Sequence, residues 1–217
     1  MTHPERIIRQ RPNTADVLRS DHLVGCYGLK PVPQTRPHAC GAAAVATVLR
    51  YLGKEADEYH CTEALLPSPV VGVTWWPIVK YLRKRGVKAL GWVHYSVDQI
   101  IENVKAGAPT LVEWLDWSGH WVVCCGYDKA TDALVFADPA RPGSQFTCCT
   151  TKEFKRHWMS GGTGSMEHNP ALAVEVKISK IRDDASYEYV KHQKAKDVLY
   201  DWRTKKMFIR KQQHALA

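Results

Sequence analysis

The pattern of apolar and polar positions divides the chain into a helical first half and a strand-rich second half. CGAAAVATVLRYLG begins at Cys40, is apolar on most faces, contains no proline and ends at Gly53. This pattern predicts a helix buried at the centre of the protein. Capping and stop signals predict two further helices, over about 74–86 and 96–107, with a short strand (VKALGWV) between them.

Short runs rich in β-branched and aromatic residues dominate the second half, and turn residues separate them. The runs are TLVEWLDW, HWVVCCGY, ALVFADP and ALAVEVKI. One more helix is expected after Thr150, where Glu153 completes a capping pattern. Helices first and antiparallel strands afterwards predict one α+β domain.

The two ends of the chain differ from its middle. Residues 1–33 are polar and weakly patterned, which predicts an N-terminal arm with a helical turn or two after Asn13. From Tyr189 onward the chain holds eight Lys/Arg and two Asp/Glu, so this segment carries +6 of the total charge of +8. We expect a long charged helix over about 185–213. The predicted organisation is an arm (1–33), a domain (34–180) and a separable basic helical extension (181–217).

Length and composition exclude several classes of protein. A chain of 217 residues with 45% hydrophobic residues can bury the core of one ordinary domain. It has no run of 18 apolar residues and no apolar stretch near its start, so neither a membrane-spanning helix nor a signal peptide is expected. Seven cysteines in a chain of this length predict reduced thiols. We therefore expect a cytoplasmic protein, with delivery by a dedicated system as the alternative.

Two vicinal cysteine pairs, Cys124–Cys125 and Cys148–Cys149, lie inside predicted strands. Because side chains alternate along a strand, the two thiols of each pair point to opposite faces of the sheet. Their spacing is not that of a zinc site, so we interpret them as core residues.

Cys40 is the candidate nucleophile. It opens the predicted central helix, where unpaired backbone N–H groups and the helix dipole favour a thiolate. A lone cysteine there can equally be a small buried residue, so the assignment depends on its neighbours. Gln34 stands on the loop six residues earlier. Its side-chain amide can curl back beside the sulfur and, with the Cys40 N–H, stabilise an oxyanion.

His120 and Asp138 are the candidate base and its orienting partner. His120 stands at the start of one predicted strand, and Asp138 ends the next. The hairpin between these strands places both residues at one edge of the sheet. Nucleophilic catalysis needs an imidazole with one nitrogen toward the thiol and the other held by a carboxylate. HW and DP pairs are common individually, but their order and context here are specific.

Three strings together resemble the C39-like branch of the papain superfamily, which includes the bacteriocin-leader peptidases and their stand-alone relatives. The strings are Q-x5-CGAAAVATVLRYLG, GHWVVxxGYD and FADPA. The resemblance spans about residues 33–178 and implies a papain-like cysteine peptidase fold. It also implies that the nucleophile, the base, the base-orienting residue and the oxyanion residue are Cys40, His120, Asp138 and Gln34. Ala39 and Ala42 depart from the acidic residue and the proline that family members often carry there.

The sequence therefore predicts a hydrolase that cleaves a peptide or isopeptide amide through a thioester, acts on a peptide or protein substrate and needs no cofactor. Two alternatives stay open: an acyltransferase of the same fold, similar to transglutaminases or phytochelatin synthase, and a non-catalytic binding module. The basic tail either packs on the domain or docks an acidic partner, nucleic acid or a membrane surface. The chain shows no ATPase or membrane-spanning portion, so coupled export is not expected.

Overall fold

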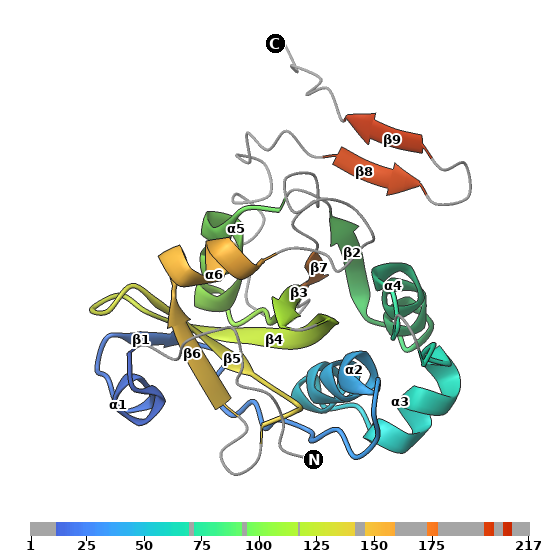
Figure 1. Ribbon diagram of the computed structural model, residues 1–217, viewed down its shortest axis with the longest axis horizontal. Helices are drawn as coiled ribbons and strands as arrows, with labels where there is room; N and C mark the ends of the chain where they lie inside the picture. The colour runs from blue at the N-terminus through green and yellow to red at the C-terminus, as the bar shows by residue number, and fades with distance from the viewer. Residues whose placement is uncertain are drawn as a thin grey trace.

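An antiparallel sheet forms the centre of the protein. The computed structural model describes residues 12–69, 72–92, 95–116, 118–141, 146–158, 173–177, 198–201 and 206–209. The strands of the main sheet are β1 (Leu23–Gly25), β2 (Lys88–Trp92), β3 (Thr110–Asp116), β4 (Ser118–Asp128), β5 (Ala133–Ala137), β6 (Phe146–Thr150) and β7 (Ala173–Lys177). Their order is β2-β7-β3-β4-β5-β6, and β1 pairs with β4 off this path (Figure 1).

Helices cover both faces of the sheet. They are α1 (Thr14–Leu18), α2 (Cys40–Tyr51), α3 (Glu58–Leu65), α4 (Trp75–Lys84), α5 (Val97–Lys105) and α6 (Thr151–His157). On one face α2 packs against β4, with α3 and α4 beside it, and on the other face lie α5 and α6 (Figure 1). The predicted α+β architecture is therefore present, with the helical segments and the sheet in the expected order.

The helix α2 is buried as its sequence predicts. Every residue from Cys40 to Leu49 is buried. The small residues of this helix allow close packing: a Cβ atom at Gly41 would collide with the side chain of Val73 and press on the indole of Trp121. The nucleophile candidate is thus the first residue of a helix that the core holds rigidly.

Alternation along the strands separates two cores, one on each face of the sheet. Leu111, Trp121 and Val123 face α2, whereas Val112, Trp114 and Val122 face α5 and α6. The vicinal cysteines follow the same rule, and all four are buried. The pairs divide between the two cores as Cys125 and Cys148 on the α2 side and Cys124 and Cys149 on the other. Core packing of these thiols is confirmed.

Side-chain caps begin the helices where the sequence indicates. Asn13 caps α1, and Ser96 forms a reciprocal capping box with Gln99 at the start of α5. The hydroxyl of Thr150 accepts the third N–H of α6. Thr74 stands at the N-cap position of α4 without a side-chain cap bond.

The described part of the predicted N-terminal arm packs with the domain. Its strand β1 pairs with β4, and four of its side chains join the core on the α2 side. These are Val17, Cys26, Leu29 and Val32. The sequence interpretation missed β1 and α3, although it placed Cys148 and Cys149 in a strand, which is β6. Strand β1 is only three residues long, and the apolar residues of α3 (EYHCTEAL) are too few for a helical pattern.

The prediction of a helix over 185–213 is wrong for the part of that stretch that the structure describes. Two strands, β8 (Val198–Asp201) and β9 (Lys206–Ile209), form a separate two-stranded antiparallel sheet. VLYD and KMFI are short runs rich in residues that favour strands, and the four residues between them suit a hairpin connection. The rest of 181–217 lies outside the described residues. The division of the chain at 33 and 180 stays a prediction.

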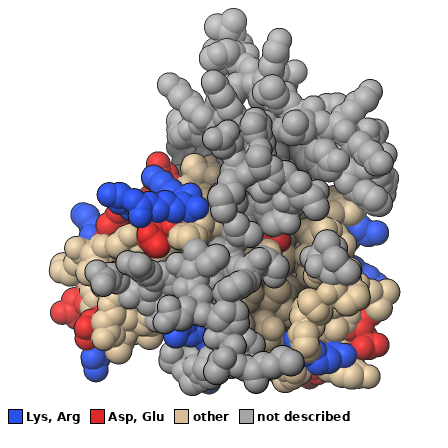
Figure 2. All heavy atoms as spheres, viewed as in Figure 1, with Lys and Arg blue, Asp and Glu red and all other residues tan. Residues whose placement is uncertain are grey.

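The surface carries charges of both signs. On the described part of the face in Figure 2, lysine and arginine side chains lie among aspartates and glutamates. This mixing agrees with the sequence, in which residues 1–188 hold only +2 of the net charge. None of the helices in the described ranges has the length and apolar character that crossing a membrane requires.

Candidate active site

Cys40, His120 and Asp138 meet where the start of α2 reaches one end of the sheet. Cys40 begins α2, His120 is the third residue of β4, and Asp138 directly follows β5. His120 Nε2 lies 2.9 Å from Asp138 Oδ1. The other ring nitrogen, Nδ1, is left for the hydrogen bond between the imidazole and the Cys40 thiol. Three of the four predicted site residues are therefore in direct contact.

The turn after β5 fixes the orientation of Asp138. Its Oδ1 accepts the N–H of Ala140 at 3.0 Å as well as the bond from His120, an Asx-turn arrangement. The Asp138 side chain is 0% exposed, and that of His120 is 12% exposed. In such a dry position the carboxylate and the imidazole interact more strongly than they would in water.

The surroundings of Cys40 favour a thiolate. Burial would raise the pKa of this thiol, but the hydrogen bond and the charge of His120, with the backbone N–H groups of Trp121 and Gly41, lower it below its usual value. The Gly41 N–H belongs to the first turn of α2. Because the N-cap residue Ala39 makes no side-chain cap bond, the N–H groups of this turn are available to the sulfur.

The same contacts favour a protonated His120. Burial would lower the pKa of the imidazole, but hydrogen bonds and charges from Asp138 and Cys40 raise it to about 10. A lowered thiol pKa and a raised imidazole pKa both favour the thiolate–imidazolium pair over the neutral pair. The pair titrates as a unit rather than as two independent groups.

The other six thiols have the opposite environment. Burial is the largest influence on each, and it raises the pKa of every one. The pKa reaches about 11 for Cys61 and about 12 for Cys125 and Cys149, and it is also raised for Cys26, Cys124 and Cys148. Among the seven, Cys40 alone has a lowered pKa.

Gln34 is held close to this site by its main chain. Its backbone N–H donates to the carbonyl of Pro139 at 2.9 Å, which ties the loop before α2 to the turn that carries Asp138. Its side-chain Nε2 donates to the Arg36 carbonyl at 3.4 Å, and its Oε1 is buried without a hydrogen-bond partner among the described residues. These contacts do not set the amide against Cys40. The oxyanion role of Gln34 stays a prediction.

The sequence interpretation missed the support of the loop between Gln34 and Cys40. Glu58 of α3 is 6% exposed, accepts the Thr35 hydroxyl at 2.8 Å and pairs with Arg36 at 3.6 Å. Asp57, which caps α3 by accepting an N–H from the first turn, is the sequence signal that could have located this helix. The loop that leads to the nucleophile is therefore anchored by a buried carboxylate.

Glu113 was also missed. It lies on β3, opposite Trp121 in the β3–β4 register, and is half-buried close to His120. Burial raises the pKa of its carboxyl to about 7, and the charge of His120 opposes that rise. In LVEWLDW, alternation puts Glu113 in phase with the core residue Leu111, which was the available signal.

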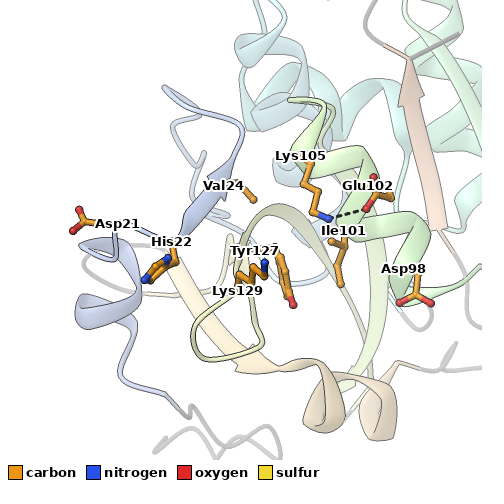
Figure 3. A pocket seen from close by; sticks show the side chains of 9 residues that line it. All are labelled: Asp21, His22, Val24, Asp98, Ile101, Glu102, Lys105, Tyr127 and Lys129. Atoms are coloured by element: carbon orange, nitrogen blue, oxygen red, sulfur yellow. Dashed lines mark hydrogen bonds and ion pairs between the residues drawn. The ribbon is translucent and has the colours of Figure 1, made fainter. Parts of the chain in front are cut away.

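The hollow in Figure 3 lies at the other end of β4. It has a volume of about 630 Å³, and residues of β1, α5 and the end of β4 line it. Tyr127 in its wall is seven residues from His120 along β4, which corresponds to about 23 Å of extended strand. Its charged groups are of both signs, and Lys105 already donates to Glu102 at 2.8 Å. This hollow is separate from the Cys40 site. Within the described ranges, no group of three or more His, Cys, Asp or Glu residues could hold a metal ion.

Comparison with known sequences identifies the family. The profile of the Peptidase_C39 like family matches residues 28–166, more than half of the chain. The chain belongs to this family. A curated relative from Methanothermobacter thermautotrophicus (strain Delta H), described as an uncharacterized protein, is 30% identical over 109 residues. The match covers 50% of this chain and 70% of that protein.

Two solved structures share the fold of this chain. A double-glycine-motif protease from an AMS/PCAT transporter, in complex with the leader peptide, matches with a TM-score of 0.54 at 20% identity, over 70% of this chain and 95% of that one. The peptidase domain of Streptococcus ComA, a bifunctional ABC transporter involved in quorum sensing, matches with a TM-score of 0.55 at 21% identity, over 68% and 97%. The papain-like fold predicted from the sequence is confirmed.

Proposed function

We propose that this protein is a cysteine peptidase that cleaves an amide bond of a peptide or protein substrate. The observation that carries the proposal is the buried chain of contacts from Cys40 through His120 to Asp138, with the pKa of the thiol lowered and that of the imidazole raised. Membership of the Peptidase_C39 like family supports the same reaction. The leader peptide bound to the AMS/PCAT protease supports a peptide substrate.

The reaction begins with attack of the Cys40 thiolate on the amide carbonyl. The Cys40 N–H and the Gln34 amide stabilise the oxyanion of the tetrahedral intermediate. The His120 imidazolium then donates its proton to the leaving amine as the C–N bond breaks, which leaves a thioester on Cys40. His120, now neutral, takes a proton from a water that attacks the thioester. The products are a carboxylic acid and the regenerated thiolate–imidazolium pair, with Asp138 holding the ring throughout.

The test is peptide cleavage on a defined mixture. A proteome-derived peptide library is incubated with the full chain in H₂¹⁸O, and new termini are identified by mass spectrometry. We expect cleavage with ¹⁸O in the new carboxylate, complete loss in Cys40→Ala and His120→Ala, and residual activity in Asp138→Asn. Identical products from Cys40→Ala would place the chemistry elsewhere.

The same experiment separates the two alternatives. With hydroxylamine added, a hydrolase still releases mostly ¹⁸O-labelled acid, whereas an acyltransferase passes the acyl group to the added nucleophile. A non-catalytic module yields no new termini. For each variant, cooperative melting confirms that loss of activity is not loss of the fold.

A further inference from the structure

Glu113 is a carboxylate beside His120 that the proposed reaction does not use. It shares a sheet face with Trp121 and Gly119, the residues on either side of His120 along β4. Asp138 follows β5, which pairs with β4 on the opposite edge from β3. The strand that carries His120 is therefore flanked by two carboxylate-bearing segments, and the charge of His120 acts on Glu113.

The Glu113 side chain leans toward the end of the sheet that holds the site. Its Oε1 occupies the space that a Cβ atom at Gly119 would need. Leu111, the previous residue on the same face, is fully buried in the core beneath α2. The carboxylate thus points away from that core and along β4 toward Gly119. Glycine at position 119 leaves it the room to do so.

This carboxylate has no partner in the described part of the chain. None of the hydrogen bonds or ion pairs there involves Glu113, although its side chain is half-buried. The charge of His120 acts on this carboxylate, but Asp138 already pairs with His120 at 2.9 Å. Removing a carboxylate from water without a partner is unfavourable. A positive group supplied from outside the chain would compensate this cost.

We propose that Glu113 is a specificity-determining residue that accepts a cationic group of the substrate, a lysine or arginine side chain or an α-amine, next to Cys40. This inference rests on the proposed function, because a substrate binds beside Cys40 only if the protein is a peptidase. The charge selectivity itself is a property of the site. It can be measured with small thiol reagents whether or not any peptide is cleaved.

The test compares the rates at which Cys40 reacts with cationic 2-aminoethyl methanethiosulfonate and neutral methyl methanethiosulfonate. Each reagent forms a mixed disulfide and releases methanesulfinate. Rates are measured on the full chain at pH 8, and peptide mapping assigns the adduct to Cys40. We expect the cationic-to-neutral rate ratio to fall roughly tenfold in Glu113→Gln, because the substitution removes a nearby charge and keeps the side-chain shape. Glu102→Gln, an exposed carboxylate change on α5, is the matched control and should leave the ratio unchanged.

Two further measurements sharpen the test. Gly119→Ala adds a Cβ where the carboxylate lies, so it should displace Glu113 and lower the ratio in the same way. The wild-type ratio should also shrink toward that of Glu113→Gln between pH 8 and pH 6, because a carboxyl with a pKa of about 7 becomes protonated there. Taking the ratio of the two rates cancels pH-dependent changes in the reactivity of the Cys40–His120 pair, whose charge acts on Glu113.

The outcomes separate the possible roles. A cationic-to-neutral rate ratio that Glu113→Gln leaves unchanged would overturn the proposal. If both reagents slow equally, Glu113 acts on the thiolate itself and not on the cation. A second experiment compares peptides that the protein cleaves and that carry either lysine or norleucine at the same position. In Glu113→Gln, kcat/KM should fall for the lysine peptide and not for the norleucine peptide. A Glu113-dependent reagent ratio in a protein that cleaves no peptide would reject the proposed function and leave the cation subsite established.

Discussion

The contact between Asp138 and His120 should control how much of Cys40 is present as thiolate. Asp138→Asn removes the negative charge 2.9 Å from the imidazole and keeps the size of the side chain. An opposite charge at this range changes a pKa by about 1–3 units, and each unit corresponds to about 1.36 kcal/mol. A decrease of about two units in the pKa of His120 disfavours the thiolate–imidazolium pair relative to the neutral pair by about 100-fold.

Iodoacetamide alkylation of Cys40 across pH 5–10 measures this effect. In the wild type, the lowered pKa of Cys40 should move the loss of rate to a lower pH than that of an ordinary thiol. In Asp138→Asn the loss should begin at higher pH, and the rate at pH 6 should fall by on the order of tenfold. The two proteins should converge near pH 10, where the thiolate forms in either case.

Two controls make this result interpretable. Asp16→Asn, an exposed carboxylate on α1, should reproduce the wild-type profile. The melting temperature of Asp138→Asn tests whether the asparagine still accepts the Ala140 N–H, as its side-chain oxygen can. Superimposable pH profiles for wild type and Asp138→Asn would refute the argument that Asp138 sustains the ion pair.

Three further predictions concern the loop before α2 and the tail. Gln34→Ala should lower kcat about 10²–10³-fold and leave the iodoacetamide rate of Cys40 unchanged, since alkylation forms no oxyanion; a parallel loss in both measurements would contradict this. Glu58→Gln should lower the free energy of unfolding by about 1–3 kcal/mol in urea titrations, because it weakens the bonds from Thr35 and Arg36 to a buried acceptor. Truncation near Arg182 should give a protein that melts cooperatively and whose Cys40 still reacts, whereas an insoluble product would show that the tail completes the core.

Most of the fold could be predicted because its signals are local. The capping box at Ser96 and the apolar run after Cys40 each specify an element from a few neighbouring residues. The missed strand β1 is three residues long and is stabilised by pairing with β4, a contact about 100 residues away in sequence. In the tail, the charged stretch was interpreted as one long helix, but its apolar runs pair as two antiparallel strands, with Leu199 opposite Phe208. Strand pairing of this kind leaves a weaker local signal than a helix does.

The candidate site divides in the same way. The positions of Cys40, His120 and Asp138 could be predicted because each stands at the end of a recognisable helix or strand. Glu58 and Glu113 could not, because their importance comes from contacts between segments distant in sequence. Nothing in the local sequence indicates that α3 packs against the loop before α2, or that a strand carboxylate leans over Gly119.

The low pKa of Cys40 comes from its position at the end of the sheet and not from its burial in the core. All seven thiols are buried, and burial by itself raises the pKa of a thiol and makes it inert. Cys40 differs because it lies at a helix start, where N–H groups are unpaired, and at the strand end that carries His120. Substitutions that alter this end of the sheet should therefore change the pKa and reactivity of Cys40 with little effect on the free energy of unfolding. Substitutions of core residues such as Leu49 should do the reverse, with a loss of about 2–5 kcal/mol in the free energy of unfolding.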